Sequence, residues 1–112
     1  MNRGEIYWVN LEPAKAPELG KMRPALIVSN SETNQALDSV VMVPLSSRPP
    51  EIWPLRMEIH LASGSQNLPK KSFAVIAGIR QVAKSRIQKF QGIADDASMK
   101  KIDEAVQSYL SE

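Results

Sequence analysis

The chain has 112 residues, of which 43% are hydrophobic and 23% charged, with a formal net charge of +2. This length suits one domain, residues 1–112, and the composition is that of a globular protein rather than a disordered one. The absence of cysteine and the single histidine exclude a disulfide framework and argue against a metal centre. No apolar run is long enough to span a membrane, and the N-terminus lacks a signal-peptide core, so we expect a cytoplasmic protein.

Positive charge is concentrated in one segment, residues 70–91, which has six cations and no acid. These cations are Lys70, Lys71, Arg80, Lys84, Arg86 and Lys89. Such a segment can bind a polyanion such as RNA or DNA. It can equally be a solvated face whose counter-charges come from elsewhere in the fold, for example from Asp95 and Asp96. The sequence leaves both interpretations open.

Prolines and glycines divide the first two-thirds of the chain into short segments, which favours strands over long helices. We expect strands at residues 5–11, 24–30 and 40–45, the first of them apolar on both faces near its middle. The proline-containing stretch 12–22 is expected to be a loop. Residues 31–38 are polar enough for a loop or a single helical turn.

The second half of the chain begins with a strictly alternating stretch, residues 55–61, which is typical of a half-buried strand. The continuous apolar run 73–79 predicts a fully buried central strand. Near the C-terminus, Asp95 or Asp96 can cap a helix with a stripe of apolar residues at helical spacing. That stripe, expected in the core or at a dimer contact, contains Met99, Ile102, Val106 and Leu110. One helix packed against a small, strongly curved antiparallel sheet or barrel is the expected architecture.

The motif Gly20-Lys-Met-Arg-Pro24 joins the first loop to the second strand. Because a residue before proline avoids the helical region, Arg23 is expected in an extended conformation at the strand entrance. A guanidinium held there presents a planar fork suited to a phosphate. The alternative is a surface arginine that pairs with Glu18 or another carboxylate.

A second polar motif, Ser46-Ser47-Arg48, leads from the third strand into a proline-rich loop. Its hydroxyls can bind a phosphate or orient a nucleophile, or they can be ordinary turn formers. Trp53 in the same loop can stack on an unpaired base or contact a partner, or it can fill the core beneath the loop.

His60 lies on the polar side of the alternating strand, with Arg56 and Glu58. It can act as an acid or base near neutral pH, or it can be a solvent-facing histidine without a role. The sequence has no glycine-rich phosphate loop, G-x-S-x-G elbow or close cluster of carboxylates. Any phosphodiester cleavage would therefore run without metal, which RNA permits because its 2′-OH can attack the adjacent phosphate.

Motifs in order along nearly the whole chain resemble the MazF/PemK toxins of bacterial toxin–antitoxin systems. The first two are Arg3-Gly-Glu-Ile-Tyr-Trp-Val-Asn-Leu-Glu-Pro13 and Gly20-Lys-Met-Arg-Pro-Ala-Leu-Ile-Val-Ser-Asn30. Val41-Met-Val-Pro-Leu-Ser-Ser47, Ile79-Arg-Gln-Val-Ala-Lys-Ser-Arg-Ile87 and the Met99-x-x-Ile-Asp-x-Ala-Val106 helix follow. The paired first motifs, with their spacing, make this resemblance specific.

The resemblance implies an SH3-like antiparallel β-barrel with a C-terminal α-helix, a homodimer, and sequence-specific cleavage of single-stranded RNA (mRNA) without metal or cofactor. It also implies neutralisation by a cognate antitoxin whose acidic C-terminal tail covers the RNA groove. Arg23 corresponds to the family's principal catalytic arginine, and Ser46 to a hydroxyl residue that is usually threonine. Glu18 and Lys21 match positions that line the RNA site. The other candidate RNA-binding residues are Ser47, Trp53, Arg56 and Arg80.

One departure from the family pattern lies directly before Ile79. Family members commonly carry an acidic residue and a glutamine there, and this chain has Ala77 and Gly78. The protein then relies on Arg23 and Ser46 alone, recruits a residue such as His60, or cleaves poorly, and Gly78 leaves space for an RNA base. The related CcdB toxins share the barrel but poison DNA gyrase, so a non-nuclease toxin that binds gyrase or antitoxin is the alternative. A third reading is a nucleic-acid-binding barrel with no toxin role.

Overall fold

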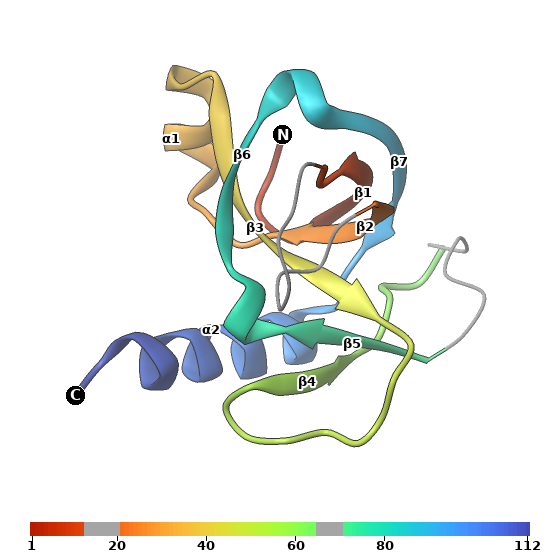
Figure 1. Ribbon diagram of the computed structural model, residues 1–112, viewed down its shortest axis with the longest axis vertical. Coiled ribbons are helices and arrows are strands. Elements are labelled where there is room, and N and C mark those ends of the chain that lie inside the picture. Colours follow the sequence, from red (N-terminus) through yellow and green to blue (C-terminus); the bar gives the residue numbers. More distant parts are fainter. Residues whose placement is uncertain (13–20, 65–70) are drawn as a thin grey trace.

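A computed structural model describes residues 1–12, 21–64 and 71–112 of the chain (Figure 1). The strands are β1 (Glu5–Asn10), β2 (Met22–Ile27), β3 (Ser39–Ser46), β4 (Arg56–Ile59), β5 (Ser72–Val75), β6 (Arg80–Ala83) and β7 (Ile87–Ile93). The helices are α1 (Ser31–Ala36) and α2 (Asp96–Leu110), with the 3₁₀ turns η1 (Ile76–Gly78) and η2 (Lys84–Arg86). None of the helices in the described residues is long and apolar enough to cross a membrane.

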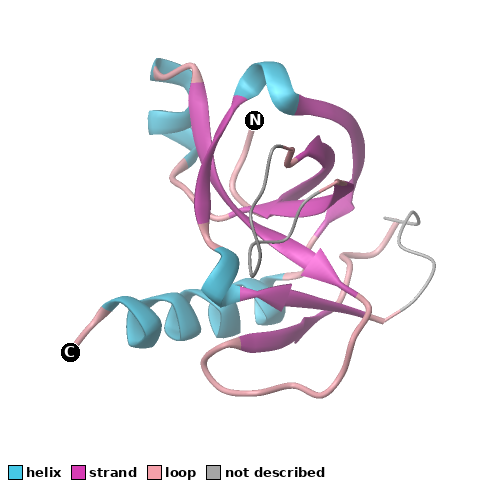
Figure 2. Cartoon of the chain, in the orientation of Figure 1, coloured by secondary structure: helices cyan, strands magenta, loops and turns pink. Residues whose placement is uncertain are grey.

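The strands form one antiparallel sheet in the order β4-β5-β3-β2-β1-β7, and β6 is added beside β3. The sheet curls on itself, and α2 lies across its lower part in the view of Figure 2. Register shifts between β1 and β7 mark irregular pairing there, and such bulges increase the twist of a strand. This arrangement confirms the predicted fold class, a mainly β, SH3-like antiparallel barrel with a C-terminal helix.

Two hydrophobic clusters occupy opposite faces of the central strands. Along β2, Leu26 belongs to the cluster beneath α2, whereas its neighbours Ala25 and Ile27 belong to the cluster inside the curl. Along β1, Ile6 and Val9 are divided between the two clusters in the same way. The strands are therefore apolar on both faces because the helix covers one face and the curled sheet encloses the other. This confirms the prediction that the first strand is apolar on both sides.

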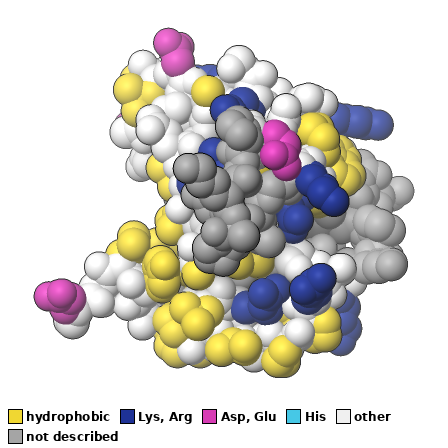
Figure 3. Space-filling model, in the orientation of Figure 1, with side chains coloured by type: hydrophobic (Ala, Val, Ile, Leu, Met, Phe, Trp, Pro, Cys, Tyr) yellow, Lys and Arg dark blue, Asp and Glu magenta, His cyan; other side chains and the backbone are white. Residues whose placement is uncertain are grey.

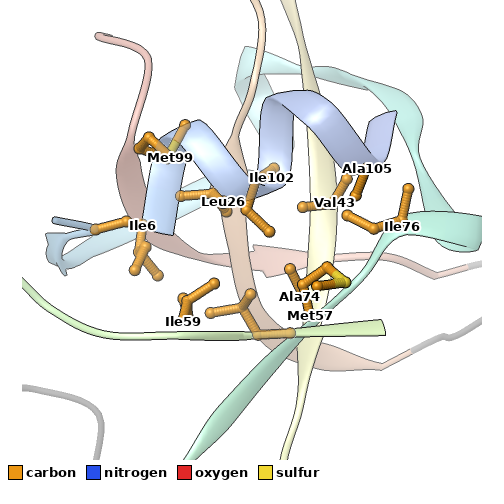
Figure 4. Packing of buried hydrophobic residues seen from close by; sticks show 12 residues of the cluster. Ile6, Leu26, Val43, Met57, Ile59, Ala74, Ile76, Met99, Ile102 and Ala105 are labelled. Atoms are coloured by element: carbon orange, nitrogen blue, oxygen red, sulfur yellow. The ribbon is translucent and has the colours of Figure 1, made fainter. Parts of the chain in front are cut away.

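The helix α2 begins where the sequence predicts, after Asp95. The Asp95 carboxylate accepts a hydrogen bond from the Ser98 N–H at 2.8 Å, and this bond is the main reason that the pKa of Asp95 is lowered. Met99, Ile102 and Ala105 point from α2 into the cluster beneath it (Figure 4). Leu110 at the end of the predicted stripe is 64% exposed, so the core contact ends before the last helical turn.

The structure decides one open alternative and corrects two other parts of the sequence prediction. Residues 31–38 contain the short helix α1, which Asn30 caps through hydrogen bonds from the Glu32 and Thr33 N–H groups to its side-chain oxygen. The alternating strand is shorter than residues 55–61: Met57 and Ile59 are buried, but Leu55 lies in a turn and is 42% exposed. The strands β6 and β7 were not predicted, because the cations among residues 80–93 interrupt the apolar pattern there.

The prediction of one buried strand over residues 73–79 is wrong, because β5 ends at Val75 and the chain turns through η1. Both β5 and β6 pair with the same edge of β3: Ala74 lies opposite Leu45, and Arg80 lies opposite Met42. From Ala74 to Arg80 the chain advances six residues, whereas the paired stretch of β3, from Leu45 back to Met42, covers only three. The surplus residues leave the sheet as a 3₁₀ turn, closed by a hydrogen bond from the Ile79 N–H to the Ile76 carbonyl at 3.0 Å.

Gly78 in this turn lies against the ring of Pro44. A Cβ at Gly78 would lie 2.8 Å from the Pro44 Cγ and 3.1 Å from its Cδ. The space that the missing side chain leaves is therefore filled by the proline, which corrects the expectation that Gly78 leaves space for an RNA base. Ala77 beside it is exposed.

Ile102→Ala tests the packing of α2 on the sheet. Ile102 is fully buried, so its truncation should lower the free energy of unfolding by about 2–5 kcal/mol in urea denaturation. Leu37→Ala is the control, because Leu37 is 56% exposed and should change stability by about 0.5 kcal/mol or less. Equal effects of the two substitutions would contradict the described core.

Gly78→Ala tests the contact with Pro44. The added methyl has to displace the proline ring, and we expect a loss of about 1–3 kcal/mol in the free energy of unfolding. Pro44→Ala removes the ring atoms that the methyl would meet, so Gly78→Ala should cost less in that background. A wild-type stability for Gly78→Ala alone would show that the turn does not depend on this close approach.

Candidate functional site

Arg23 and Ser46 lie at the ends of two paired strands, β2 and β3. In the β2–β3 ladder, Leu26 lies opposite Val43 and Ala25 opposite Pro44, and this pairing ends two residues before Arg23 and two residues before Ser46 is reached. The guanidinium of Arg23, which is half-buried, donates a hydrogen bond to the Leu45 carbonyl at 3.4 Å. Arg23 thus contacts the residue that precedes Ser46 in the chain.

Ser46 ends β3 and begins a tight turn. Its hydroxyl oxygen accepts a hydrogen bond from the Arg48 N–H at 3.1 Å, and the Arg48 carbonyl in turn accepts one from the Arg56 guanidinium at 3.2 Å. The ordinary turn-forming role that the sequence allowed for this serine is therefore present. It uses the oxygen as acceptor, and the hydroxyl keeps its proton for a second partner. Ser47 is exposed beside it.

The loop between β3 and β4 carries Trp53, which is 53% exposed. This excludes the alternative that Trp53 fills the core under the loop. The carboxylate of Glu51 accepts hydrogen bonds from the Glu58 N–H and the Lys101 ammonium, both at 2.8 Å. The Lys101 bond is the main cause of a lowered pKa for Glu51. The loop is thereby tied to both β4 and α2, and the indole stays at the surface.

A second cluster of hydrogen bonds joins the end of β1 to the residue before β2. Arg86 donates hydrogen bonds to the carbonyls of Asn10, at 3.4 Å, and Glu12, and Arg80 donates to the Leu11 carbonyl at 3.5 Å. The Glu12 carboxylate accepts a hydrogen bond from the Lys21 N–H. The sequence analysis counted Arg86 among the cations of residues 70–91 but did not connect it with Glu12, because nothing local links residues so far apart.

The remaining candidates lie in different surroundings. Glu18 and Lys70 lie outside the described residues. His60 is exposed, and its backbone is bonded to α2: its N–H donates to the Ser98 hydroxyl, and its carbonyl accepts from the Asp95 N–H. Lys71 lies 4.0 Å from the Glu58 carboxylate. The cation-rich segment is thus split between several places rather than forming one face. Figure 3 shows one side of the molecule, where dark-blue basic side chains gather near its middle.

Ala77 leaves the site without a carboxylate at the position where the family commonly has one, and Gly78 is closed off by Pro44. Among residues 1–12, 21–64 and 71–112 no group of three His, Cys, Asp or Glu side chains is placed to hold a metal ion. What the described residues do assemble is a guanidinium and a hydroxyl at adjacent strand ends, with further cations nearby. Such groups suit the binding of a phosphodiester and of charge that develops on it.

Similarity to known proteins supports the same interpretation of the site. The endoribonuclease MazF9 of Mycobacterium tuberculosis is 30% identical over an alignment of 115 residues, covering 98% of this chain and 96% of that protein. The endoribonuclease EndoA of Bacillus subtilis is 25% identical, with 99% and 95% coverage. A mycobacterial endoribonuclease solved with its cognate antitoxin has the same fold, with a TM-score of 0.78 at 24% identity, over 98% of this chain and 94% of that one.

The MazF of Deinococcus radiodurans also shares the fold, with a TM-score of 0.77 at 21% identity and coverage of 98% and 96%. The family model that describes PemK-like, MazF-like toxins matches residues 2–110, which include both strand ends of the site. This match spans nearly the whole chain, and it agrees with the motifs that join Arg23 to the second strand and Ser46 to the third. The protein therefore belongs to the PemK-like, MazF-like toxins of type II toxin–antitoxin systems.

Proposed function

We propose that this toxin is an endoribonuclease that cuts single-stranded RNA at a site formed by Arg23 and Ser46. The observation that carries the proposal is the hydrogen bond from the Arg23 guanidinium to the carbonyl of Leu45, the residue before Ser46. The similarity to named endoribonucleases over nearly the whole chain supports the same activity. We place its action in the cytoplasm, where mRNA is available.

The chemistry is an internal phosphoryl transfer. The RNA 2′-oxygen forms a bond to the adjacent phosphorus and loses its proton, while the bond from phosphorus to the 5′-oxygen breaks and that oxygen gains a proton. The products are a 2′,3′-cyclic phosphate and a 5′-hydroxyl. Negative charge accumulates on the phosphoryl oxygens in the transition state, and preorganised donors aimed at that charge provide the main acceleration.

Each of the two residues has a specific task in this reaction. The Arg23 guanidinium balances the charge on the phosphoryl oxygens, because it is planar and rich in donors. The Ser46 hydroxyl donates to the phosphate, since the Arg48 N–H already occupies an acceptor position on its oxygen. Without a carboxylate at Ala77, the site works through electrostatic stabilisation rather than through a side-chain base at that position.

The surrounding residues bind the RNA on either side of the cut. Lys21, Ser47, Arg56 and Arg80 contact the phosphate backbone, and Glu18 lines the same site. Arg56 and Arg80 each donate to a backbone carbonyl, but a guanidinium has five N–H donors and retains others for a phosphate. The exposed ring of Trp53 stacks on a base, an interaction worth about 1–3 kcal/mol in single-strand binding.

We further propose that the protein acts as a homodimer and is neutralised by an antitoxin with an acidic C-terminal tail. The basic residues around the site complement such a tail as they complement RNA. The relative that was solved with its cognate antitoxin supports this pairing. Antitoxin binding without RNA cleavage would identify a toxin of the non-nuclease kind.

The assignment is tested by incubating the purified protein, in EDTA, with a long single-stranded RNA and mapping the cut ends. Discrete cuts at one short sequence are expected from the wild type. Arg23→Ala should lower the cleavage rate about 10²–10³-fold, because it removes a preorganised donor. Arg23→Lys keeps the charge but loses the planar fork, so its cleavage rate should lie between those of the wild type and Arg23→Ala.

Lys100→Ala serves as the control for the loss of one positive charge, since Lys100 is exposed on α2; it should cut like the wild type. If folded Arg23→Ala retained full cleavage, the assignment of the site to Arg23 would be wrong. If the folded wild type failed to cut any RNA, the endoribonuclease assignment would be wrong, and binding of gyrase and antitoxin would be measured next.

A further inference from the structure

We propose that Glu12 is a positioning residue for Arg23, acting through the backbone of Lys21. This inference rests on the proposed RNA cleavage and adds a residue to it that touches neither the RNA nor the reacting atoms. Three independent features of the described residues lead to it: the hydrogen bonds that hold Glu12, the bond that Glu12 accepts, and the backbone conformation of Lys21.

The first feature is the way the segment Asn10–Glu12 is held. Its three consecutive carbonyls all accept hydrogen bonds from arginines of the β6–η2 region, Arg86 binding those of Asn10 and Glu12 and Arg80 that of Leu11. The Glu12 N–H also donates to the Asn10 side-chain oxygen at 3.0 Å. Charged donors make stronger hydrogen bonds than neutral ones, so these contacts hold the backbone of Asn10–Glu12 in place where β1 ends.

The second feature is the contact between Glu12 and the backbone of Lys21. From its fixed position, the Glu12 carboxylate accepts a hydrogen bond from the Lys21 N–H. The Leu11 N–H donates to the Lys21 carbonyl at 3.0 Å. The N–H and the carbonyl of Lys21 are therefore both hydrogen-bonded to one short segment. The side chain of Glu12 makes one of these two bonds, and the backbone of Leu11 makes the other.

The third feature explains why a hold is needed. Lys21 has a φ of +64°, in the left-handed region that glycine adopts freely and other residues adopt at a cost. That cost corresponds to a shift of about tenfold in a local equilibrium. A non-glycine residue persists there when its surroundings over-determine it, and such residues gather at functional sites. The Glu12 carboxylate is positioned to provide this determination.

Lys21 is two residues before Arg23, at the point where β2 begins its pairing with β1. Met22 lies opposite Asn10, and Arg23 lies opposite Val9. If Lys21 leaves the left-handed conformation, the direction from which the chain enters β2 changes next to the catalytic guanidinium. Transition-state groups are sensitive to such shifts, because a displacement of about 1 Å can lower a rate about 10²-fold. A lysine on a flexible stem tolerates the same displacement in binding a phosphate.

A double-mutant cycle between positions 12 and 21 tests this coupling. Single-turnover cleavage of a long single-stranded RNA, with protein in excess, gives the rate constant at saturation and the half-saturating protein concentration. Glu12→Ala should lower the saturating rate constant about tenfold and change the half-saturating concentration by less than about threefold. In the Lys21→Gly background the same substitution should lower the rate constant by less than about threefold, because glycine accepts the conformation unaided.

Two controls separate positioning from charge and from folding. Glu12→Gln loses the same negative charge but keeps an oxygen that accepts from the Lys21 N–H, so its rate constant should stay within about twofold of the wild type. Glu104→Ala removes an exposed acid on α2 and should leave cleavage unchanged. Rates are measured at a temperature at which urea titration shows every variant to be folded.

Each other outcome overturns the inference. An equal loss of rate in both backgrounds would show that Glu12 does not act through the conformation of Lys21. A higher half-saturating concentration with an unchanged rate constant would make Glu12 a binding residue instead. An active wild type with an equally active Glu12→Ala would remove Glu12 from the mechanism, whereas an inactive wild type would be a failure of the proposed endoribonuclease activity itself.

Discussion

The double pairing of β3 is the constraint on which the rest of this fold depends. One edge of β3 is bonded to β2, and the other edge is divided between β5, near Leu45, and β6, near Met42. Because two strands share one edge end to end, the chain between them has to leave the sheet, and η1 is the result. Its close fit requires a residue without a Cβ at Gly78, where the ring of Pro44 fills the space.

The same strand brings the two cores together and ends at the site. Met42 faces the cluster inside the curl, while Val43 and Leu45 face the cluster under α2, so β3 is buried on both sides up to its last residues. Ser46 is the point at which this burial ends. Its hydroxyl follows a strand that is packed on both faces, and the role that we propose for Ser46 relies on preorganisation of this kind.

The cations of the protein illustrate how a fold divides residues of one chemical kind. Arg23 lies near the start of β2. The proline that follows it keeps the backbone of Arg23 out of the helical region of φ/ψ space. Arg80 and Arg86 hold carbonyls of the chain that leads into the β1–β2 connection. Arg56 holds the turn after Ser46. Three of these arginines therefore support neighbouring backbone, in addition to the RNA contacts that we propose for Arg56 and Arg80.

Local patterns in the sequence were sufficient for the first three strands, the alternating core of β4, the capped helix α2, and the motifs that carry Arg23 and Ser46, but not for β6 and β7. Hydrophobic periodicity, proline geometry and helix capping are properties of near neighbours, so the sequence alone determined them. The end of β5 at Val75, the contact of Pro44 with Gly78 and the left-handed Lys21 held by Glu12 were decided by the tertiary structure. Each depends on which distant strand supplies the neighbouring atoms, and no short stretch of sequence contains that information.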